Sequence, residues 1–150
     1  MTMSDALEAV VPMLLRLSLD LPRDAATVAV ARRALDGALA GVGVEDDCRA
    51  DIQLALTEAC DNVVAHSLAA VDYTVDVTVD GDRCTIEVCD QGDGFVPSRS
   101  SMPGPSATSG RGLHIVAALV DHLDIVSSAG AGTRLRFTKT LTWATASRPA

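Results

Sequence analysis

The sequence lacks the cysteine patterns and the hydrophobic leader of a secreted, zinc-binding or membrane-spanning protein. Its four cysteines form no C-x-x-C pair, so neither a zinc site nor a disulfide framework is expected, and reduced thiols are the simpler account. The first residues carry no basic flank and include Asp5 and Glu8, which predicts neither a signal peptide nor a membrane span. We therefore expect a cytoplasmic protein.

Basic and aromatic residues are also scarce. Twelve Lys and Arg stand against twenty Asp and Glu, giving a formal net charge of −8 and a pI near 4.6. Because nucleic acids and anionic membranes bind basic surfaces, neither is expected as a partner. One Trp, one Tyr and two Phe leave the core to Val, Leu, Ile and Ala, since 48% of the chain is apolar. This composition fits layered α and β elements.

The pattern of apolar residues predicts one domain, residues 15–140, between an amino-terminal extension, residues 1–14, and a flexible tail, residues 141–150. Within the extension, residues 4–14 could form a short helix that Pro12 disturbs. Strict alternation predicts strands, and helical spacing capped by Asp24 or closed by Gly41 predicts helices. The strands are expected at residues 15–21, 73–79, 84–88, 122–127 and 133–139. The helices are expected at residues 24–40, from the acidic residues 45–47 through residues 54–66, and after Gly112.

Three polar side chains stand in register on one predicted helix. Glu58, Asn62 and His66 recur every fourth residue, which stacks them along one side of the helix axis. They border an apolar stripe with the spacing of a core-facing surface: Ile52, Ala55, Leu56, Ala59 and Val63. Such a margin can line a cleft, but ordinary boundary residues would give the same spacing. The pattern alone leaves both interpretations open.

A carboxylate continues an apolar row at the end of a predicted strand. Asp90 is the next position on the face that carries three apolar residues, namely Cys84, Ile86 and Val88. A carboxylate there needs a hydrogen-bond donor if it is buried; alternatively, the strand has ended and Asp90 is a solvated turn residue. Gly92 and Gly94 follow at once, and they indicate either a close approach of the backbone to another group or a tight turn.

The long segment at residues 96–109 is rich in Pro, Ser, Gly and Thr and has no periodicity, so we expect a mobile lid. It leads through Gly110-Arg111-Gly112-Leu113 into an apolar helix, whose unpaired N–H groups and positive dipole end suit a phosphate. Thr133 opens an apolar row on the last strand much as Asp90 closes one. The hydroxyl therefore lies near the carboxylate if these two strands are neighbours.

Four motifs, in order, resemble the N, G1, G2 and final Gly-Thr boxes of the GHKL (histidine-kinase-like) ATPases. They are Glu58-x-x-x-Asn62-x-x-x-His66, Asp90-x-Gly92-x-Gly94-Phe95, Gly110-Arg111-Gly112-Leu113 and Gly132-Thr133. The length and the form Glu-Ala-x-x-Asn-x-x-x-His resemble the bacterial anti-sigma-factor serine/threonine kinases. The resemblance implies a Bergerat-type α/β (α+β) two-layer sandwich: a mixed, mostly antiparallel sheet with helices on one face and ATP held between the layers.

The resemblance also implies roles in adenine binding. Asp90 would accept a hydrogen bond from the adenine amino group, and Thr133 would support it from the last strand. Gly92 and Gly94 would let the backbone approach the base.

For the phosphates, the resemblance implies that Asn62 coordinates Mg²⁺ through its amide oxygen. Four consecutive residues, Gly110, Arg111, Gly112 and Leu113, would form the phosphate-binding segment. Because residues 96–109 contain no lysine, the remaining phosphate charge would rest on the helix end and on Arg99 or Arg111. Glu58 would orient or deprotonate the attacking hydroxyl.

The implied function is that of an ATP-dependent serine/threonine kinase and anti-sigma factor, which phosphorylates a STAS-type anti-sigma-factor antagonist and sequesters a sigma factor. A homodimer is a further option. The alternative is a protein-binding module whose surface is set by nucleotide and which lacks significant kinase activity; Glu58 favours the enzyme, because a pure binder does not need that carboxylate. His66 is expected to be a structural histidine rather than a phosphoacceptor.

Overall fold

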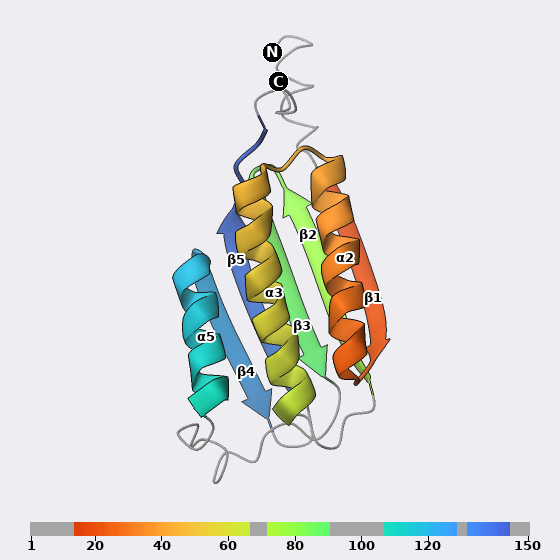
Figure 1. The fold of residues 1–150 in the computed structure, drawn as a ribbon, viewed down its shortest axis with the longest axis vertical. Coiled ribbons are helices and arrows are strands. Elements are labelled where there is room, and N and C mark those ends of the chain that lie inside the picture. The colour runs from red at the N-terminus through yellow and green to blue at the C-terminus, as the bar shows by residue number, and fades with distance from the viewer. Residues whose placement is uncertain (1–13, 67–71, 91–106, 129–131, 145–150) are drawn as a thin grey trace, which may run out of the picture.

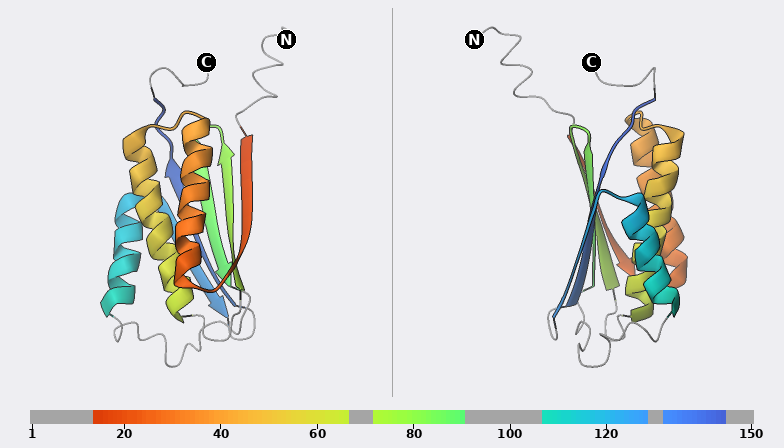
Figure 2. Two further views of the ribbon diagram at one scale, coloured as in Figure 1. Left: turned by 45° about the vertical axis from the view of Figure 1, so that its right-hand side comes forward. Right: turned by 90° about the vertical axis from the view of Figure 1, so that its left-hand side faces the viewer.

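The computed structural model describes residues 14–66, 72–90, 107–128 and 132–144. In these residues, five strands form one sheet and three helices cover one of its faces (Figure 1). Figure 2 shows that no described helix covers the opposite face. None of the described helices is long and apolar enough to cross a membrane. The elements are β1 (Leu14–Pro22), α2 (Ala25–Gly41), α3 (Asp46–His66), β2 (Asp72–Asp80), β3 (Arg83–Asp90), α5 (Ala107–Leu119), β4 (His122–Ser128) and β5 (Gly132–Thr140).

The described strands lie in the order β1-β2-β3-β5-β4, and every neighbouring pair is antiparallel. The two-layer sandwich with helices on one face is confirmed, but the sheet is not mixed as predicted. The reason is the connection through α5, which leads from β3 to a strand of the same direction one place further out. The β5 strand then folds back into the gap, so the parallel strands β3 and β4 are never neighbours.

Both long helices begin as the sequence predicted. The Asp24 side chain caps α2 by accepting a hydrogen bond from the backbone N–H of Ala26 at 2.8 Å, which satisfies one of the unpaired donors at a helix start. Acidic residues occupy the first turn of α3, where the helix dipole favours negative charge. The predicted stripe of α3 is buried against the sheet and the other helices, comprising Ile52, Ala55, Leu56, Ala59 and Val63.

A two-residue turn sets the register of the central hairpin. Gly81 has a φ of 62°, a conformation that glycine adopts at no steric cost. The turn at Gly81-Asp82 pairs Tyr73 with Asp90 at the far end of the hairpin. On the other side of β3, Asp90 pairs with Thr133 of β5. The hairpin turn therefore fixes which residues flank Asp90.

At the opposite end of the molecule, the chain after β5 packs against two loops. Leu141 is 3% exposed, the backbone of Trp143 forms a bridge with Val44, and the Trp143 indole N–H donates to Asp82 Oδ1 at 2.7 Å. For residues 141–144 this differs from the flexible tail predicted, because one apolar and one aromatic residue find partners in the loops after α2 and β2. The rest of that tail, residues 145–150, and residues 1–13 lie outside the described residues.

Replacing Trp143 by Ala is expected to lower the free energy of unfolding by about 1–3 kcal/mol, because a half-buried aromatic side chain and its hydrogen bond to Asp82 are both lost. Urea unfolding followed by circular dichroism measures the change. Thr142→Ala is the matched control, since the Thr142 side chain is exposed and its loss is expected to stay within about 0.5 kcal/mol. Equal stability of the Trp143→Ala variant and the wild type would show that this segment does not anchor the fold.

Candidate functional site

The predicted site residues that the structure describes lie on elements that reach the same end of the sheet. Asp90 is the last residue of β3, Thr133 is the second residue of β5, and Asn62 lies near the end of α3. The first half of α5, which includes Gly112, lies at the same lower end in Figure 1. Helices α3 and α5 pack side by side along their lengths. The fold therefore brings residues of all four motifs to one end of the sheet. Of the second motif, only Asp90 lies within the described residues.

Asp90 and Thr133 form a buried polar pair across two neighbouring strands. They are direct cross-strand partners, and only 3% of Asp90 and 4% of Thr133 is exposed. Asp90 is thus a strand residue and not a solvated turn residue, which resolves the alternative that the sequence left open. Both side chains take part in interactions within the molecule. Because the apolar residues of β3 and β5 continue the same face, the pair sits at the polar end of an otherwise hydrophobic layer.

Tyr73 is a further residue of this site that sequence reasoning missed. It pairs with Asp90 from the other side, in β2, and is fully buried. Its hydroxyl lies 2.9 Å from Thr27 Oγ1, which in turn lies 2.8 Å from the carbonyl oxygens of Pro22 and Asp24. Since Thr27 has one hydroxyl hydrogen and donates it to a carbonyl, Tyr73 is the donor to Thr27. The two-residue turn at Gly81-Asp82 was the signal that could have identified it.

Burial raises the pKa of the Tyr73 hydroxyl, which keeps it protonated and able to donate.

The cysteines offer no competing nucleophile. Cys48 is a buried free thiol. Burial raises the pKa of the free thiols of Cys60, Cys84 and Cys89 to about 12. At neutral pH such thiols stay neutral and unreactive. The chemistry of the site therefore rests on its carboxylates, amide and hydroxyls.

On α3, Glu58 and Asn62 lie one turn apart beside the buried stripe. Asn62 is 8% exposed and has an interaction partner within the molecule, whereas Glu58 is half-buried. Both positions agree with the predicted polar margin of the helix. His66 is the last residue of α3, but its side chain lies outside the described part of the chain, so its role stays a prediction.

Glu58 reaches across to α5 and touches Gly112, the second glycine of the third motif. A Cβ atom placed on Gly112 would lie 2.8 Å from Glu58 Oε2, closer than two such atoms normally come. The carboxylate therefore packs directly against the backbone of α5. This contact joins the first motif to the third.

The start of α5 differs from the prediction. The sequence predicted that the loop would extend to residue 109 and that Gly110 to Gly112 would precede the helix, whereas α5 begins at Ala107. Ala is the strongest helix former, and the two following residues, Thr and Ser, are compatible with a first helical turn. Gly110 and Arg111 are therefore helical, with side chains outside the described part, and Leu113 packs against the core. The predicted lid residues 96–106, with Arg99, and the glycines Gly92 and Gly94 also lie outside it.

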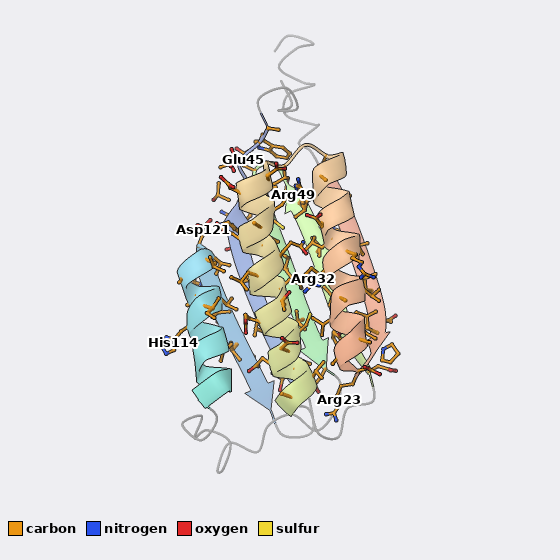
Figure 3. All side chains as sticks on the ribbon, in the orientation of Figure 1. Arg23, Arg32, Glu45, Arg49, His114 and Asp121 are labelled. Atoms are coloured by element: carbon orange, nitrogen blue, oxygen red, sulfur yellow. The ribbon has the colours of Figure 1, made fainter. Side chains whose placement is uncertain are left out.

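Two hollows lined by described residues lie away from this site. One, of about 450 Å³, lies over α2 and α3 and is lined by Arg32, Arg33 and Arg49 among others; Figure 3 shows Arg32 and Arg49 between these helices. Arg49 forms ion pairs with Asp36 and Asp46. The other, of about 570 Å³, includes Arg136 and opens on the uncovered face of the sheet. Neither is lined by a predicted site residue, so we keep the end of the sheet as the candidate site.

The chain is similar to known proteins of one family. Residues 21–139 match the family model of the histidine kinase-like ATPase domain. A serine-protein kinase RsbW of Bacillus licheniformis is 30% identical over 117 residues, which cover 69% of this chain and 73% of that protein. An anti-sigma F factor of Thermoanaerobacter sp. (strain X514) is 31% identical over 98 residues, which cover 60% of this chain and 68% of that protein.

Among solved structures, the chain is similar to a crystal structure of the RsbU and RsbW domains of a Mycobacterium tuberculosis protein. The two agree with a TM-score of 0.66 at 25% identity, over 91% of this chain and 34% of that one. The chain thus spans about a third of that crystallised chain. With a family model that covers most of its length and relatives among the serine-protein kinases RsbW and the anti-sigma F factors, the chain belongs to the histidine kinase-like ATPase domain family.

Proposed function

We propose that this protein is an ATP-dependent serine/threonine protein kinase that phosphorylates a STAS-type anti-sigma-factor antagonist, and an anti-sigma factor that sequesters a sigma factor in the cytoplasm. The observation that supports it most is the meeting of three groups at one end of the sheet. A buried carboxylate–hydroxyl pair, Asp90 and Thr133, lies at the strand ends. The second group is a carboxylate and an amide on α3, Glu58 and Asn62. The third is helix α5, which Glu58 touches at Gly112.

In this proposal, Asp90 holds the adenine. A buried carboxylate that faces an exocyclic amino group accepts a strong hydrogen bond, because one partner is charged. Thr133 orients it from the neighbouring strand, and Tyr73 packs on its other side without competing for the amino group, since its hydroxyl donates to Thr27. The adenine would therefore be recognised by one hydrogen-bond acceptor, the Asp90 carboxylate, at a fixed position in the sheet.

Asn62 is proposed to hold Mg²⁺. The amide oxygen is a hard donor of the kind that Mg²⁺ prefers, and one or two protein ligands suffice when phosphates and water supply the rest. A polar side chain that is only 8% exposed near the end of α3 fits this demand. The chemistry supplied with the metal is neutralisation of phosphate charge during the transfer.

Glu58 is proposed to act on the acceptor hydroxyl. When the serine or threonine oxygen of the antagonist bonds to the γ-phosphorus of ATP, the bond to the ADP oxygen breaks and the hydroxyl proton passes to the Glu58 carboxylate. Glu58 is half-buried, which leaves it accessible to a docked substrate. Because α5 begins at Ala107, the backbone N–H groups without a partner inside the helix belong to its first turn, residues 107–109. These N–H groups are proposed to face the phosphates.

The protein partners are proposed from the similarity of this chain to its named relatives. The relatives are named as serine-protein kinases RsbW and as anti-sigma F factors, which supports both a protein substrate and a sigma factor as ligands of this chain. We also propose that the protein forms a homodimer. Incubating the protein and its co-expressed neighbours with labelled ATP is the direct test: label is expected on a serine or threonine of a small antagonist, and its absence would leave the nucleotide-set binding module as the better account.

Replacing Asn62 by Ala is expected to weaken Mg²⁺-dependent ATP binding about tenfold or more. Loss of a metal ligand should cost at least as much as the 10–100-fold that follows loss of an outer partner of a ligand. Titration calorimetry with ATP, in Mg²⁺ and in EDTA, separates the metal-dependent part. The exposed neighbour Asp61 provides the control, because Asp61→Ala alters the same helix without touching the proposed ligand. If Asn62→Ala keeps the full Mg²⁺ dependence, the metal is held elsewhere.

A further inference from the structure

Gly112 occupies a position where its conformation does not require glycine. It lies inside α5, where Ala is more favourable than Gly, and its φ is not in the left-handed region that only glycine adopts easily. The glycines whose backbone does need that freedom are elsewhere in the described residues, at Gly43, Gly81 and Gly132. We therefore ask what a Cβ atom at position 112 would meet.

One side chain fills the space that this Cβ atom would enter. The three atoms nearest to a Cβ built on Gly112 all belong to Glu58: Oε2 at 2.8 Å, Cδ at 3.8 Å and Cβ at 3.9 Å. By contrast, a Cβ on Gly37 of α2 would have no atom within 4 Å. Of Gly37 and Gly112, only Gly112 has the Glu58 carboxylate beside it.

Helix α5 cannot easily move away from this contact. At its other end, the Lys139 ammonium donates to the carbonyl oxygen of Leu119 at 2.6 Å and lies 3.7 Å from Asp51 Oδ2 of α3. Just beyond the helix, Asp121 accepts a hydrogen bond from the backbone N–H of Thr140. Val116, between the two ends, is fully buried. A Cβ at position 112 would therefore displace the Glu58 carboxylate, the flexible end of a side chain, and not the helix.

We infer that Gly112 is a positioning residue for Glu58: its bare α-carbon leaves the space in which the carboxylate lies, and so sets where that carboxylate meets the acceptor hydroxyl. This inference rests on the proposed kinase function. It gives Gly112 a task separate from phosphate binding, for which the backbone N–H of any residue would serve. One helix then carries both the proposed phosphate-binding backbone and the surface against which the carboxylate packs.

Gly112→Ala is expected to lower kcat for phosphoryl transfer by about tenfold to 100-fold, because a displacement of about 1 Å can cost 100-fold. The KM for ATP should stay within about threefold, since the substitution leaves the first turn of α5, which is proposed to face the phosphates, unchanged. The melting temperature should be unchanged or raised, because the displaced atom is the free end of a side chain. The matched control is Gly37→Ala, which should raise the melting temperature by about 2–4 °C and leave kcat unaltered.

A double-mutant cycle tests whether the effect passes through Glu58. Glu58→Asp shortens the side chain by one methylene and makes room for the new methyl group. Gly112→Ala should therefore lower kcat much less in the Glu58→Asp background than in the wild type. Additive effects, or a loss of ATP affinity in proportion to kcat, would show that Gly112 acts on the nucleotide and would overturn the inference.

A readout that needs no phosphoryl transfer separates this inference from the proposed function. The ¹³C resonance of the Glu58 side-chain carboxyl, in protein without nucleotide, should move in Gly112→Ala and stay in place in Gly37→Ala. If the wild type transfers no phosphate but this resonance moves, the kinase proposal fails and the contact stands. If the resonance is the same in all three proteins, Gly112 does not position Glu58.

Discussion

Replacing Glu58 by Gln is expected to lower phosphoryl transfer by roughly 100-fold or more and to leave ATP and partner binding in place. Gln keeps the size of the side chain, so its packing against Gly112 survives. It loses the negative charge that would orient the acceptor hydroxyl and accept its proton. Because the proposed nucleotide contacts come from Asn62, Asp90 and α5, none of them depends on this charge.

Single-turnover transfer of labelled phosphate to the antagonist, measured beside calorimetry with ATP, separates the two properties. Asp61→Asn is the matched control: it removes another carboxylate from α3, three residues further along, which is exposed to solvent. The control is expected to transfer phosphate at the wild-type rate. A Glu58→Gln variant as fast as the wild type would rule out Glu58 as the base, and a wild type without transfer would favour the binding-module alternative.

The parts of the fold that follow local rules could be predicted from the sequence. A two-residue turn at Gly81-Asp82 sets the register of β2 and β3, and the alternation of Val and polar residues tells which face is buried. The cap at Asp24 and the apolar stripe of α3 were likewise set by neighbouring residues. The sequence signal for each of these features lies in a short stretch of the chain, where periodicity and turn chemistry are informative.

Features that depend on distant contacts could not be predicted in the same way. Nothing local in β3 or β4 says that β5 inserts between them, yet that insertion makes Thr133 the partner of Asp90. The ordering of residues 141–144 depends likewise on Val44 and Asp82. The contact of Glu58 with Gly112 depends on how α3 and α5 pack. The sequence could name most of the candidate site residues, but the distances between them come from the packing of the whole domain.

The burial of Asp90 has an energetic consequence for ligand binding. A carboxylate that is 3% exposed has lost most of its contact with water, so a ligand donor that reaches it does not have to displace well-ordered solvent from a fully hydrated charge. Backbone pairing fixes Asp90 between its two neighbours in the sheet, Tyr73 and Thr133. The acceptor is therefore held in place before the ligand arrives, which reduces the entropic cost of binding.

Asp90→Asn is accordingly expected to weaken ATP binding by about 1–3 kcal/mol, or roughly fivefold to 150-fold in Kd. The Asn amide can still offer an oxygen to the adenine amino group, but it offers no charge, and its NH₂ group can take the place of that oxygen. Calorimetry with ATP measures the loss. The matched control is Asp76→Asn on the adjacent strand: its carboxylate accepts a hydrogen bond from Ser18 at 2.7 Å and faces away from the helices, so ATP affinity should not change.

Inosine triphosphate, which has a carbonyl oxygen where ATP has the amino group, tests the same contact from the ligand side. The wild type should bind it much more weakly than ATP, because two acceptors would then face each other in a buried site. The Asp90→Asn variant should discriminate less, since its amide can rotate to donate to the carbonyl oxygen. An Asp90→Asn variant with unchanged ATP affinity and unchanged discrimination would mean that the base is bound elsewhere, and the adenine role of Asp90 would have to be abandoned.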